Sequence, residues 1–128
     1  MSAYQGRYAE QIFIVEAMKR GLHIYKPVCD VNGIDFIIQL RKKLIKIQVK
    51  STSVEKSNRP NTYQVCVRKG YDCTHYTDEF NYLAAFIIPL NTFYIIPIKE
   101  LNKTTIGINP NSNKCKFFKY KEAWNLIY

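Results

Sequence analysis

Two runs with the period-two alternation of β-strands follow each other between Gly33 and Lys50, separated by the basic stretch Arg41–Leu44. Side chains two residues apart along a strand project from the same face. One face of both runs is therefore apolar and consists of Phe36, Ile38, Leu40, Ile45, Ile47 and Val49. The opposite face carries Asp35 in the first run and Gln48 and Lys50 in the second, so the pattern predicts a hairpin with one buried and one polar face.

The length of the turn decides which residue lies opposite Asp35. A four-residue loop, Arg41–Leu44, places Asp35 opposite Lys50; such loops are common, and there is no Asn-Gly to favour a two-residue turn. A three-residue loop would pair Asp35 with Val49 and put its side chain on the apolar face, unless a bulge intervened. The sequence leaves both turns open, and only the four-residue turn joins Asp35 to the polar pair without a bulge.

Apolar periodicity predicts one helix ahead of this hairpin, at Gly6–Gly21, where Gly21 provides a natural stop. The apolar side of this helix is expected to consist of Ile12, Phe13, Val15, Ala17 and Met18. A single helical turn is expected at Lys99–Asn102, and a terminal helix at Phe117–Tyr128 is expected to pack through Ala123, Trp124 and Ile127.

Further apolar runs predict additional strands, which are Leu22–Val28, Tyr63–Val67, Tyr82–Ile88 and Thr92–Ile98. Pro97 indicates that the last of these ends near the edge of a sheet, because proline cannot donate to a strand ladder. The polar stretches between the strands predict loops at Ser51–Asn61, Arg68–Asp78 and Thr105–Lys116. This order of elements predicts an α/β or α+β domain built around one mixed central β-sheet flanked by helices.

The chain of 128 residues has the size of one domain, and its apolar content of 47% is enough for a packed core. Because there is no internal repeat and no boundary, we expect residues 1–128 to form a single domain. No apolar run approaches the length of a membrane span, and residues 1–9 lack a signal-peptide pattern. We therefore expect a cytoplasmic (intracellular) protein with no membrane partner.

Nineteen Lys and Arg residues against ten Asp and Glu residues give a formal net charge of +9. For so small a domain this excess favours a polyanionic partner, most simply nucleic acid. The four cysteines contain no C-x-x-C pair, and neither histidine has zinc-like spacing to them, so no zinc or redox site is expected. Cys29 and Cys66 fall in strand-like runs and are expected to be buried.

The polar face of the hairpin carries the groups that divalent-metal phosphodiester cleavage needs. Carboxylates bind Mg²⁺ through hard oxygen ligands, and the metal polarises the phosphate and lowers the pKa of a bound water. A lysine offsets charge on the phosphate and helps the attacking water. Asp35, Gln48 and Lys50 supply these groups, although many hairpins carry such residues on a solvated face. Glu10 either projects toward the same site or is simply a carboxylate favoured near the N-terminal end of its helix.

A set of motifs around the hairpin resembles one known family. They are Gly6-x-x-Ala9-Glu10, Gly21, Pro27, Gly33-Ile34-Asp35, Ile47-Gln48-Val49-Lys50-Ser51, Thr77-Asp78-Glu79-Phe80 and Thr92-Phe93-Tyr94-Ile95-Ile96-Pro97. In this order they resemble the PD-(D/E)XK nuclease superfamily, and within it the small group that includes an intron-encoded homing endonuclease and archaeal-resolvase-like proteins. The likeness spans Gly6 to Leu101.

The resemblance implies a restriction-endonuclease-like fold with an α-β-β-β-α-β core, DNA as substrate, and Mg²⁺ as cofactor with Mn²⁺ as an alternative. By position, Asp35 is the metal-binding aspartate of the motif, Gln48 takes the place of its second acid, and Lys50 is its lysine. Glu10 matches the helix glutamate that many members add, so the implied metal ligands are Glu10, Asp35 and Gln48. Two departures are Ile34 in place of the family's proline and the amide of Gln48, whose carbonyl oxygen can still coordinate a cation.

The sequence thus predicts a Mg²⁺-dependent endodeoxyribonuclease that hydrolyses phosphodiester bonds through a D…QxK site. The alternative is a nuclease-fold protein that binds nucleic acid with weak or no catalysis. Backbone contacts are expected from Ser51, Lys56, Arg59, Arg68 and Lys69. An RNA enzyme is a weaker third reading, in which Tyr63, Tyr71 and Tyr76 would stack on unpaired bases instead of packing.

Cutting both strands of a duplex requires two active centres. We therefore expect a homodimer or a higher homo-oligomer, with the apolar run Leu83–Leu90 as a candidate interface if it is not part of the core.

Overall fold

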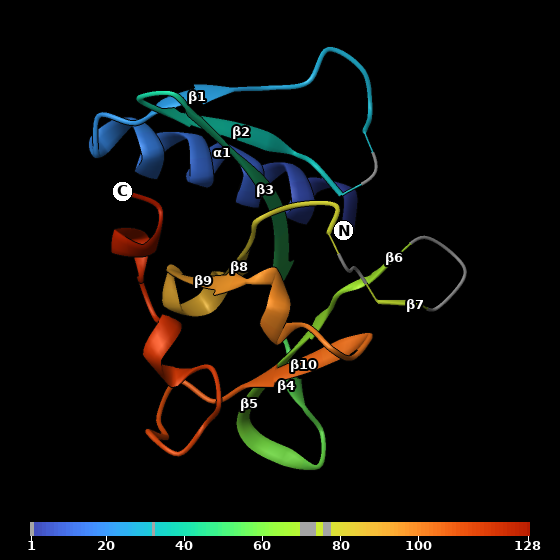
Figure 1. Cartoon of the computed structure of the whole chain (residues 1–128). Coiled ribbons are helices and arrows are strands. Elements are labelled where there is room, and N and C mark those ends of the chain that lie inside the picture. Colours follow the sequence, from blue (N-terminus) through green and yellow to red (C-terminus); the bar gives the residue numbers. More distant parts are fainter. Residues whose placement is uncertain (1, 32, 70–73, 76–77) are drawn as a thin grey trace.

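The computed structural model describes residues 2–31, 33–69, 74–75 and 78–128, and it places one long helix against a mixed sheet (Figure 1). Within these residues, five strands form the sheet in the order β1-β2-β3-β8-β9. Strands β3 and β8 are parallel, whereas the other neighbouring pairs are antiparallel, so the mixed sheet expected from the sequence is confirmed. The elements are α1 (Ser2–Lys19), β1 (His23–Tyr25), β2 (Phe36–Leu40), β3 (Lys43–Thr52), β8 (Tyr82–Ile87) and β9 (Thr92–Pro97).

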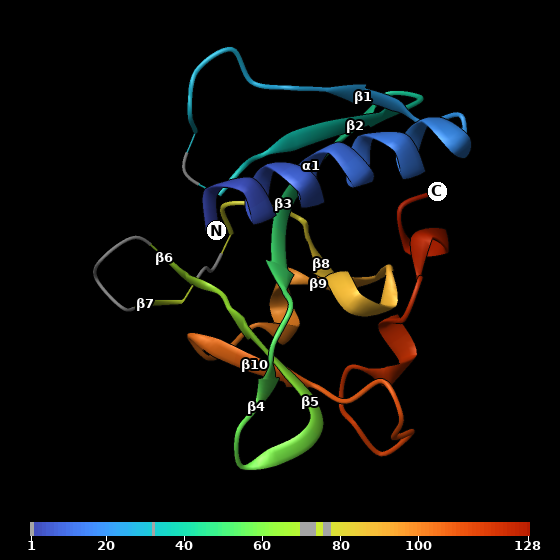
Figure 2. The same cartoon turned by 180° about the vertical axis from the view of Figure 1, so that it is seen from behind.

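A smaller three-stranded sheet lies beyond the end of β3, below the main sheet in Figures 1 and 2. Its strand order is β10-β5-β4, with β4 at Glu55–Lys56, β5 at Arg59–Cys66 and β10 at Thr105–Ile108. A short antiparallel ribbon, β6 (Arg68–Lys69) with β7 (Thr74–His75), follows β5. Four 3₁₀ turns complete the described part of the chain: η1 (Ile88–Leu90), η2 (Ile98–Glu100), η3 (Phe118–Tyr120) and η4 (Trp124–Leu126).

Helix α1 ends where the sequence indicates, at Gly21, which adopts a left-handed φ of 71°. The amide of Gly21 donates to the carbonyl of Met18, and the amide of Leu22 donates to that of Ala17, which is the Schellman pattern of a glycine-terminated helix. The buried stripe of the helix is narrower than predicted and consists of Ala9, Phe13 and Ala17. Val15 and Met18 are 49% and 65% exposed, because the 3.6-residue repeat turns both of them away from this stripe.

The core is organised around the ring of Phe13. This ring stacks on Phe36 at 5.5 Å between centroids and on Trp124 at 5.2 Å, and it meets the edge of Phe93 at 5.7 Å. The guanidinium of Arg20 lies 4.3 Å from the ring of Trp124. Helix α1, the main sheet and the C-terminal segment are therefore joined through one aromatic cluster, since offset and edge contacts between rings add to the area they bury.

The terminal helix predicted at Phe117–Tyr128 is wrong: the segment forms only the turns η3 and η4. Glu122 lies between the turns with a left-handed φ of 48°, and its amide donates to the carbonyl of Phe93 at 2.7 Å. At Glu122 the backbone therefore bonds to the edge strand β9, which separates the two turns, while Ala123, Trp124 and Ile127 are buried as expected. Within the described residues α1 is the single α-helix, so the second helix of the implied family core is not seen there.

All three stretches predicted as loops contain strands, including Arg68–Asp78, which holds β6 and β7. Part of Ser51–Asn61 extends β3 and forms β4 and the start of β5, and Thr105–Lys116 begins with β10. Strand β10 pairs with β5 so that Ile106 lies opposite Val65, and both side chains are buried. Strand β4 has two residues and β10 has four, which is too short for alternation to stand out in a single sequence.

The hairpin β8–β9 and its turn at Ile88–Leu90 agree with the sequence, and Pro97 lies on the edge strand β9 as expected. In the run Leu83–Leu90, residues 83–87 are fully buried in the core and cannot contribute to an oligomer interface, whereas Leu90 is 47% exposed. Strand β1 spans only His23–Tyr25, shorter than predicted.

The burial predicted for Cys29 and Cys66 is wrong, because both are exposed; Cys66 projects from the face of β5 opposite to Val65. None of the helices in the described ranges is long and apolar enough to cross a membrane.

We expect Phe13→Ala to lower the free energy of unfolding by about 3–5 kcal/mol, because it leaves a cavity between three other rings. The matched control on the same helix is Met18→Ala, whose side chain is exposed and whose effect should stay within about 0.5 kcal/mol. Denaturant unfolding of the two variants measures both values. Equal losses would contradict the aromatic cluster as the centre of the core.

Candidate active site

The β2–β3 hairpin closes through a two-residue turn. Leu40 pairs with Lys43, which leaves Arg41 and Lys42 as the loop, and Arg41 has a left-handed φ of 59°. The four-residue loop predicted from the sequence is therefore wrong, and so is the three-residue alternative. A positive φ in the turn matches the right-handed twist of the flanking strands, so a tight turn forms here without the usual Asn-Gly.

This tight turn brings Asp35 beside Gln48 instead of Lys50, and Nε2 of Gln48 donates to Oδ2 of Asp35 at 3.0 Å. The regular strand pairing ends one residue after Asp35, at Phe36 opposite Ile47, and the amide of Asp35 donates to the carbonyl of the same Ile47 at 2.8 Å. The side chains of Asp35 and Gln48 therefore meet through a direct hydrogen bond. The expected association of Asp35 with the polar pair is present, but it arises from a different turn.

The carboxylate of Asp35 is held by β3. Its Oδ2 accepts a hydrogen bond of 2.7 Å from the amide of Val49 and one of 3.0 Å from Nε2 of Gln48. From the described residues its Oδ1 accepts no hydrogen bond. One oxygen thus fixes the orientation of the carboxylate, and the second is available to a ligand.

Gln48 is buried, with 7% of its surface exposed, although it belongs to the face predicted to be polar. Its Nε2 donates to Asp35, which directs its Oε1 elsewhere, and this oxygen has no hydrogen-bond partner among the described residues. A buried carbonyl oxygen without a partner costs about 1–3 kcal/mol. An amide oxygen in this state is suited to a hard cation, which it can coordinate without being charged.

Helix α1 brings a second carboxylate to the same place. Glu10 and Asp35 line one cavity of about 200 Å³, together with Arg7, Lys26, Pro27, Cys29, Asp30 and Ile34. Nζ of Lys26 lies 3.9 Å from Oε1 of Glu10. Glu10 follows the fully buried Ala9, so the packing of the helix determines where this carboxylate lies.

Both carboxyl groups are harder to ionise than usual. Burial raises the pKa of Glu10, and the neighbouring Asp35 carboxylate raises it further. Burial also raises the pKa of Asp35, and the Val49 hydrogen bond and the charge of Lys50 only partly offset this. Two partly buried acids that repel each other are the environment in which a divalent cation is most favourable.

Lys50 lies two residues after Gln48 on β3 and therefore projects from the same face of the strand. Its charge lowers the pKa of Asp35, which places it within electrostatic reach of that carboxylate. The structure thus brings Glu10, Gln48 and Lys50 each to Asp35. Within the described part of the chain there is no group of three or more His, Cys, Asp and Glu side chains fit to hold a metal.

Three further charged residues border this cavity and were missed from the sequence: Arg7, Lys26 and Asp30. Arg7 stands three residues before Glu10 on the predicted helix, and this spacing alone places the two side chains on one helix face. Lys26 and Asp30 lie in the connection between β1 and β2, which has no regular periodicity. Only the packing of this connection brings them to Glu10.

The residues predicted to contact nucleic acid lie in different places. Ser51 continues β3 beyond Lys50, and its Oγ accepts a hydrogen bond of 3.3 Å from Nε2 of Gln5. Lys56 and Arg59 pair across β4 and β5 in the smaller sheet. Arg68 and Lys69 form β6, and their side chains lie outside the described part of the structure.

The hypothesis of an RNA enzyme requires Tyr63, Tyr71 and Tyr76 to stack on unpaired bases. Among the described residues this stacking surface is not formed. Tyr63 is only 7% exposed and packs in the core, while Tyr71 and Tyr76 lie outside the described residues. The part of that hypothesis that depends on Tyr63 is therefore wrong.

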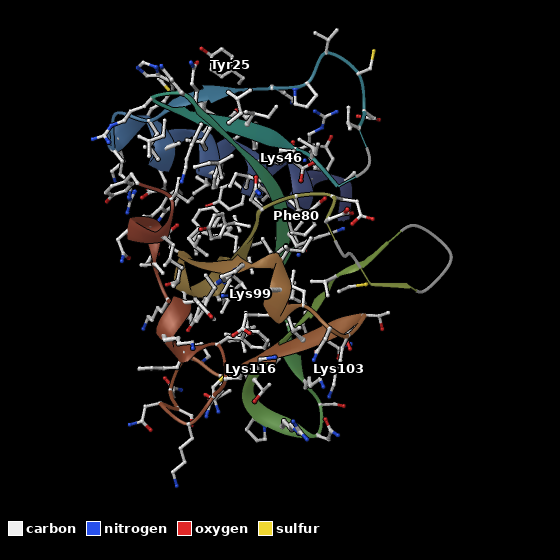
Figure 3. All side chains as sticks on the ribbon, in the orientation of Figure 1. Tyr25, Lys46, Phe80, Lys99, Lys103 and Lys116 are labelled. Carbon is white, nitrogen blue, oxygen red and sulfur yellow. The ribbon has the colours of Figure 1, made fainter. Side chains whose placement is uncertain are left out.

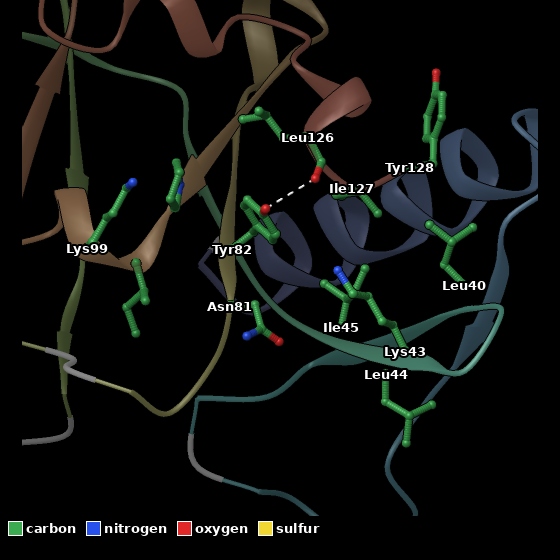
Figure 4. A pocket seen from close by; sticks show the side chains of 12 residues that line it. Leu40, Lys43, Leu44, Ile45, Asn81, Tyr82, Lys99, Leu126, Ile127 and Tyr128 are labelled. Carbon is green, nitrogen blue, oxygen red and sulfur yellow. Dashed lines mark hydrogen bonds between the residues drawn. The ribbon is translucent and has the colours of Figure 1, made fainter.

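A larger cavity lies elsewhere in the molecule. It has a volume of about 830 Å³ and lies between the β2–β3 hairpin and the C-terminal residues (Figure 4). Leu40, Leu44 and Ile127 line it, and the hydroxyl of Tyr82 donates to the carbonyl of Leu126 at its wall. Its lining contains no acid, so it lacks the groups needed for metal binding or hydrolysis.

Comparison with known proteins agrees with the fold. The family model described as PD-(D/E)XK endonuclease matches residues 2–127. Among solved structures, the chain is similar to a bacterial homing endonuclease, I-Ssp6803I, with 26% identity and a TM-score of 0.82, covering 99% of this chain and 91% of that one. No curated protein matches the sequence.

The raised pKa values predict how stability depends on pH in the absence of metal. A carboxyl group whose pKa is higher in the folded state stabilises the fold at low pH, and that contribution is lost as the pH rises through the raised value. We therefore expect Asp35→Asn, which keeps an acceptor oxygen for Val49, to raise the melting temperature in EDTA near neutral pH and to leave it almost unchanged near pH ~4.

Glu16→Gln provides the matched control with the opposite sign. The hydrogen bond from Arg20 lowers the pKa of Glu16, so this variant should lose stability near neutral pH and lose less in acid. Thermal unfolding across this pH range measures both variants. A destabilised Asp35→Asn at neutral pH would contradict the cost of ionising the buried Asp35 carboxyl group.

Proposed function

Because the chain belongs to the PD-(D/E)XK endonuclease family, we propose that it is a divalent-metal-dependent endonuclease that hydrolyses phosphodiester bonds in DNA. The observation that carries this proposal is the buried Oε1 of Gln48, which has no partner among the described residues and lies beside the hydrogen-bonded carboxylate of Asp35. DNA as the substrate is supported by the net charge of +9 and by the family.

The residues present fit a divalent cation. Glu10, Asp35 and Gln48 would hold it through two carboxylates and one amide oxygen, and hard oxygen donors of this kind suit Mg²⁺ and also Mn²⁺. When bound, such an ion polarises the phosphate and lowers the pKa of a water molecule. The cation would also relieve the repulsion between Glu10 and Asp35 that raises the pKa of Glu10.

The protein's own side chains orient and balance charge in this site. Val49 and Gln48 hold the Asp35 carboxylate in one orientation through its Oδ2. Lys50 brings a positive charge to the same face, where it offsets charge on the phosphate and helps position the attacking water. Because the Gln48 amide is neutral, it would coordinate the cation without adding a third negative charge beside Glu10 and Asp35. The pKa values of these two acids are already raised.

The second candidate function is nucleic-acid binding with weak or no catalysis in the same fold. The specific observation that favours it is Gln48 itself, because an amide in place of a carboxylate leaves a bound cation with fewer anionic ligands. The two functions differ in metal-dependent cleavage, which only the first requires.

We propose further that two copies act together on a duplex, since each strand needs one active centre. The backbone contacts are proposed to come from Ser51, Lys56 and Arg59 near the centre, and from Arg68 and Lys69 on β6.

Asp35→Ala and Lys50→Ala should each reduce Mg²⁺-dependent cleavage of plasmid DNA by about 100-fold or more, since each removes a group that acts on the reacting phosphate. Lys42→Ala removes a lysine at the hairpin turn and is the matched control, with full activity expected. Cleavage that persists in both site variants sinks the assignment of the catalytic centre. Wild-type protein that binds DNA but never cuts it in Mg²⁺ or Mn²⁺ supports the second function.

Gln48→Glu tests whether residue 48 faces the cation. The new carboxylate should tighten Mg²⁺ binding by about tenfold or more, because affinity at such sites follows the number of charged ligands. It should also lower the melting temperature without metal, since it adds repulsion to Asp35. Gln39→Glu places the same charge on β2 as a control. Calorimetric Mg²⁺ titration and thermal unfolding give both quantities, and unchanged affinity in Gln48→Glu would exclude a ligand role for residue 48.

A further inference from the structure

The outer face of the three-stranded sheet is polar and open. Along β5 the side chains of Tyr63 and Val65 are buried, whereas Gln64 and Cys66 project from the other face and are exposed. Strand β10 continues this face with Thr105 opposite Cys66 and Gly107 opposite Gln64. The inner face is therefore part of the core, and the outer face is a small platform centred on Gln64.

Gly107 leaves room around the side chain of Gln64. Because glycine has no Cβ, no side chain stands opposite Gln64 on the neighbouring strand. A Cβ added at Gly107 would come within 3.2 Å of Cγ2 of Thr62, so the strands are also packed closely here. Gln64 thus stands clear of its cross-strand neighbour, with both its donor and its acceptor presented to the outside.

Positive charge surrounds this platform. A groove of about 610 Å³ runs along β5 and β10, and five cationic side chains line it without any acidic one: Lys56, Arg59, Lys103, Lys114 and Lys116. Figure 3 shows Lys103 and Lys116 beside the lower sheet. Nζ of Lys116 donates to the carbonyl of Glu100, and no salt bridge to an acid is formed by these five within the described residues.

A second hollow lies between the platform and the end of β3. It has a volume of about 530 Å³ and is lined by Gln5, Ser51, Ser53, Lys56, Gln64 and Cys66, among others. Ser51 follows Lys50 directly, and Lys56 lines both hollows. Glu55 also lines this second hollow, and its Oε2 accepts a hydrogen bond from the amide of Asn61. The platform thus borders the stretch of β3 that begins immediately after Lys50.

We propose that the outer face of β10-β5-β4 is a sequence-reading surface for duplex DNA, in which Gln64 contacts a base edge while the surrounding cations contact phosphates. The inference rests on the proposed function for its substrate. Charge complementarity selects the occupant, since cations without acidic partners match the regular phosphates of a duplex. A glutamine side chain presents the donor and acceptor that pair with adenine in the major groove, and β-strands enter this groove in several DNA-binding proteins.

The test is selection of bound sequences from a randomised duplex DNA library by the full-length chain in EDTA, where no cleavage occurs. Gln64→Ala should lose the preference at one or two base positions, by about tenfold or more at each. Lys103→Ala and Lys114→Ala should weaken binding evenly across sequences and reduce the slope of log K against log salt by about one each. Lys42→Ala, at the far hairpin turn, should change neither quantity.

Cys66 supplies an independent readout because its exposed thiol lies on the platform. Bound duplex should protect Cys66 from maleimide alkylation, as followed by peptide mass spectrometry. Equal alkylation with and without duplex, an unchanged base preference in Gln64→Ala, or an unchanged salt slope in both lysine variants overturns the proposal. Tighter binding of an RNA library than of duplex DNA also overturns it.

The two proposals fail differently. A protein that selects sequences through Gln64 but never cuts DNA in Mg²⁺ retains the reading surface and loses the proposed catalysis. A protein that cuts DNA while Gln64→Ala binds and selects as the wild type does retains the catalysis and loses the reading surface.

Discussion

The carboxylate of Asp35 and its two hydrogen bonds to β3 are the interaction on which the site depends. Its Oδ2 accepts hydrogen bonds from the backbone amide of Val49 and from Nε2 of Gln48, so one oxygen atom is bonded both to the backbone of β3 and to a side chain of β3. Nε2 of Gln48 donates to Asp35, whereas the buried Oε1 of Gln48 has no hydrogen-bond partner among the described residues. The orientation of Gln48 thus follows from Asp35, and the suitability of the site for a cation follows from both.

The site also shows why the helix and the hairpin have to be packed together. Glu10 and Asp35 share one small cavity with Asp30, and burial makes both Glu10 and Asp35 harder to ionise. Such an arrangement costs stability unless a cation or a proton relieves it. The aromatic cluster around Phe13 holds α1 against the sheet one helical turn after Glu10, and it can hold the two acids close because its rings are fully buried.

Several elements could be predicted from local pattern because their physical cause is local. The stop at Gly21, the alternation of Ile45, Ile47 and Val49, and the edge position of Pro97 each follow from backbone geometry or strand periodicity. Other elements could not. The residues 117–128 have a helical pattern, but Glu122 bonds to Phe93 on β9 and divides the segment into two short turns. That bond joins residues distant in the chain, which no local pattern records.

The sequence by itself determined which residues are candidates for the chemistry: an acid, an amide and a lysine on one face of a hairpin, a glutamate on the preceding helix, and a strong positive charge. Only the tertiary structure decided how they meet. It replaced the expected turn by a tighter one, brought the Asp35 carboxylate into a hydrogen bond with the Gln48 amide, buried that amide, and added Arg7, Lys26 and Asp30 to the cavity. The physical reason is that strand alternation specifies a face but not a register, and register depends on the turn and on the packing of both strands against the rest of the molecule.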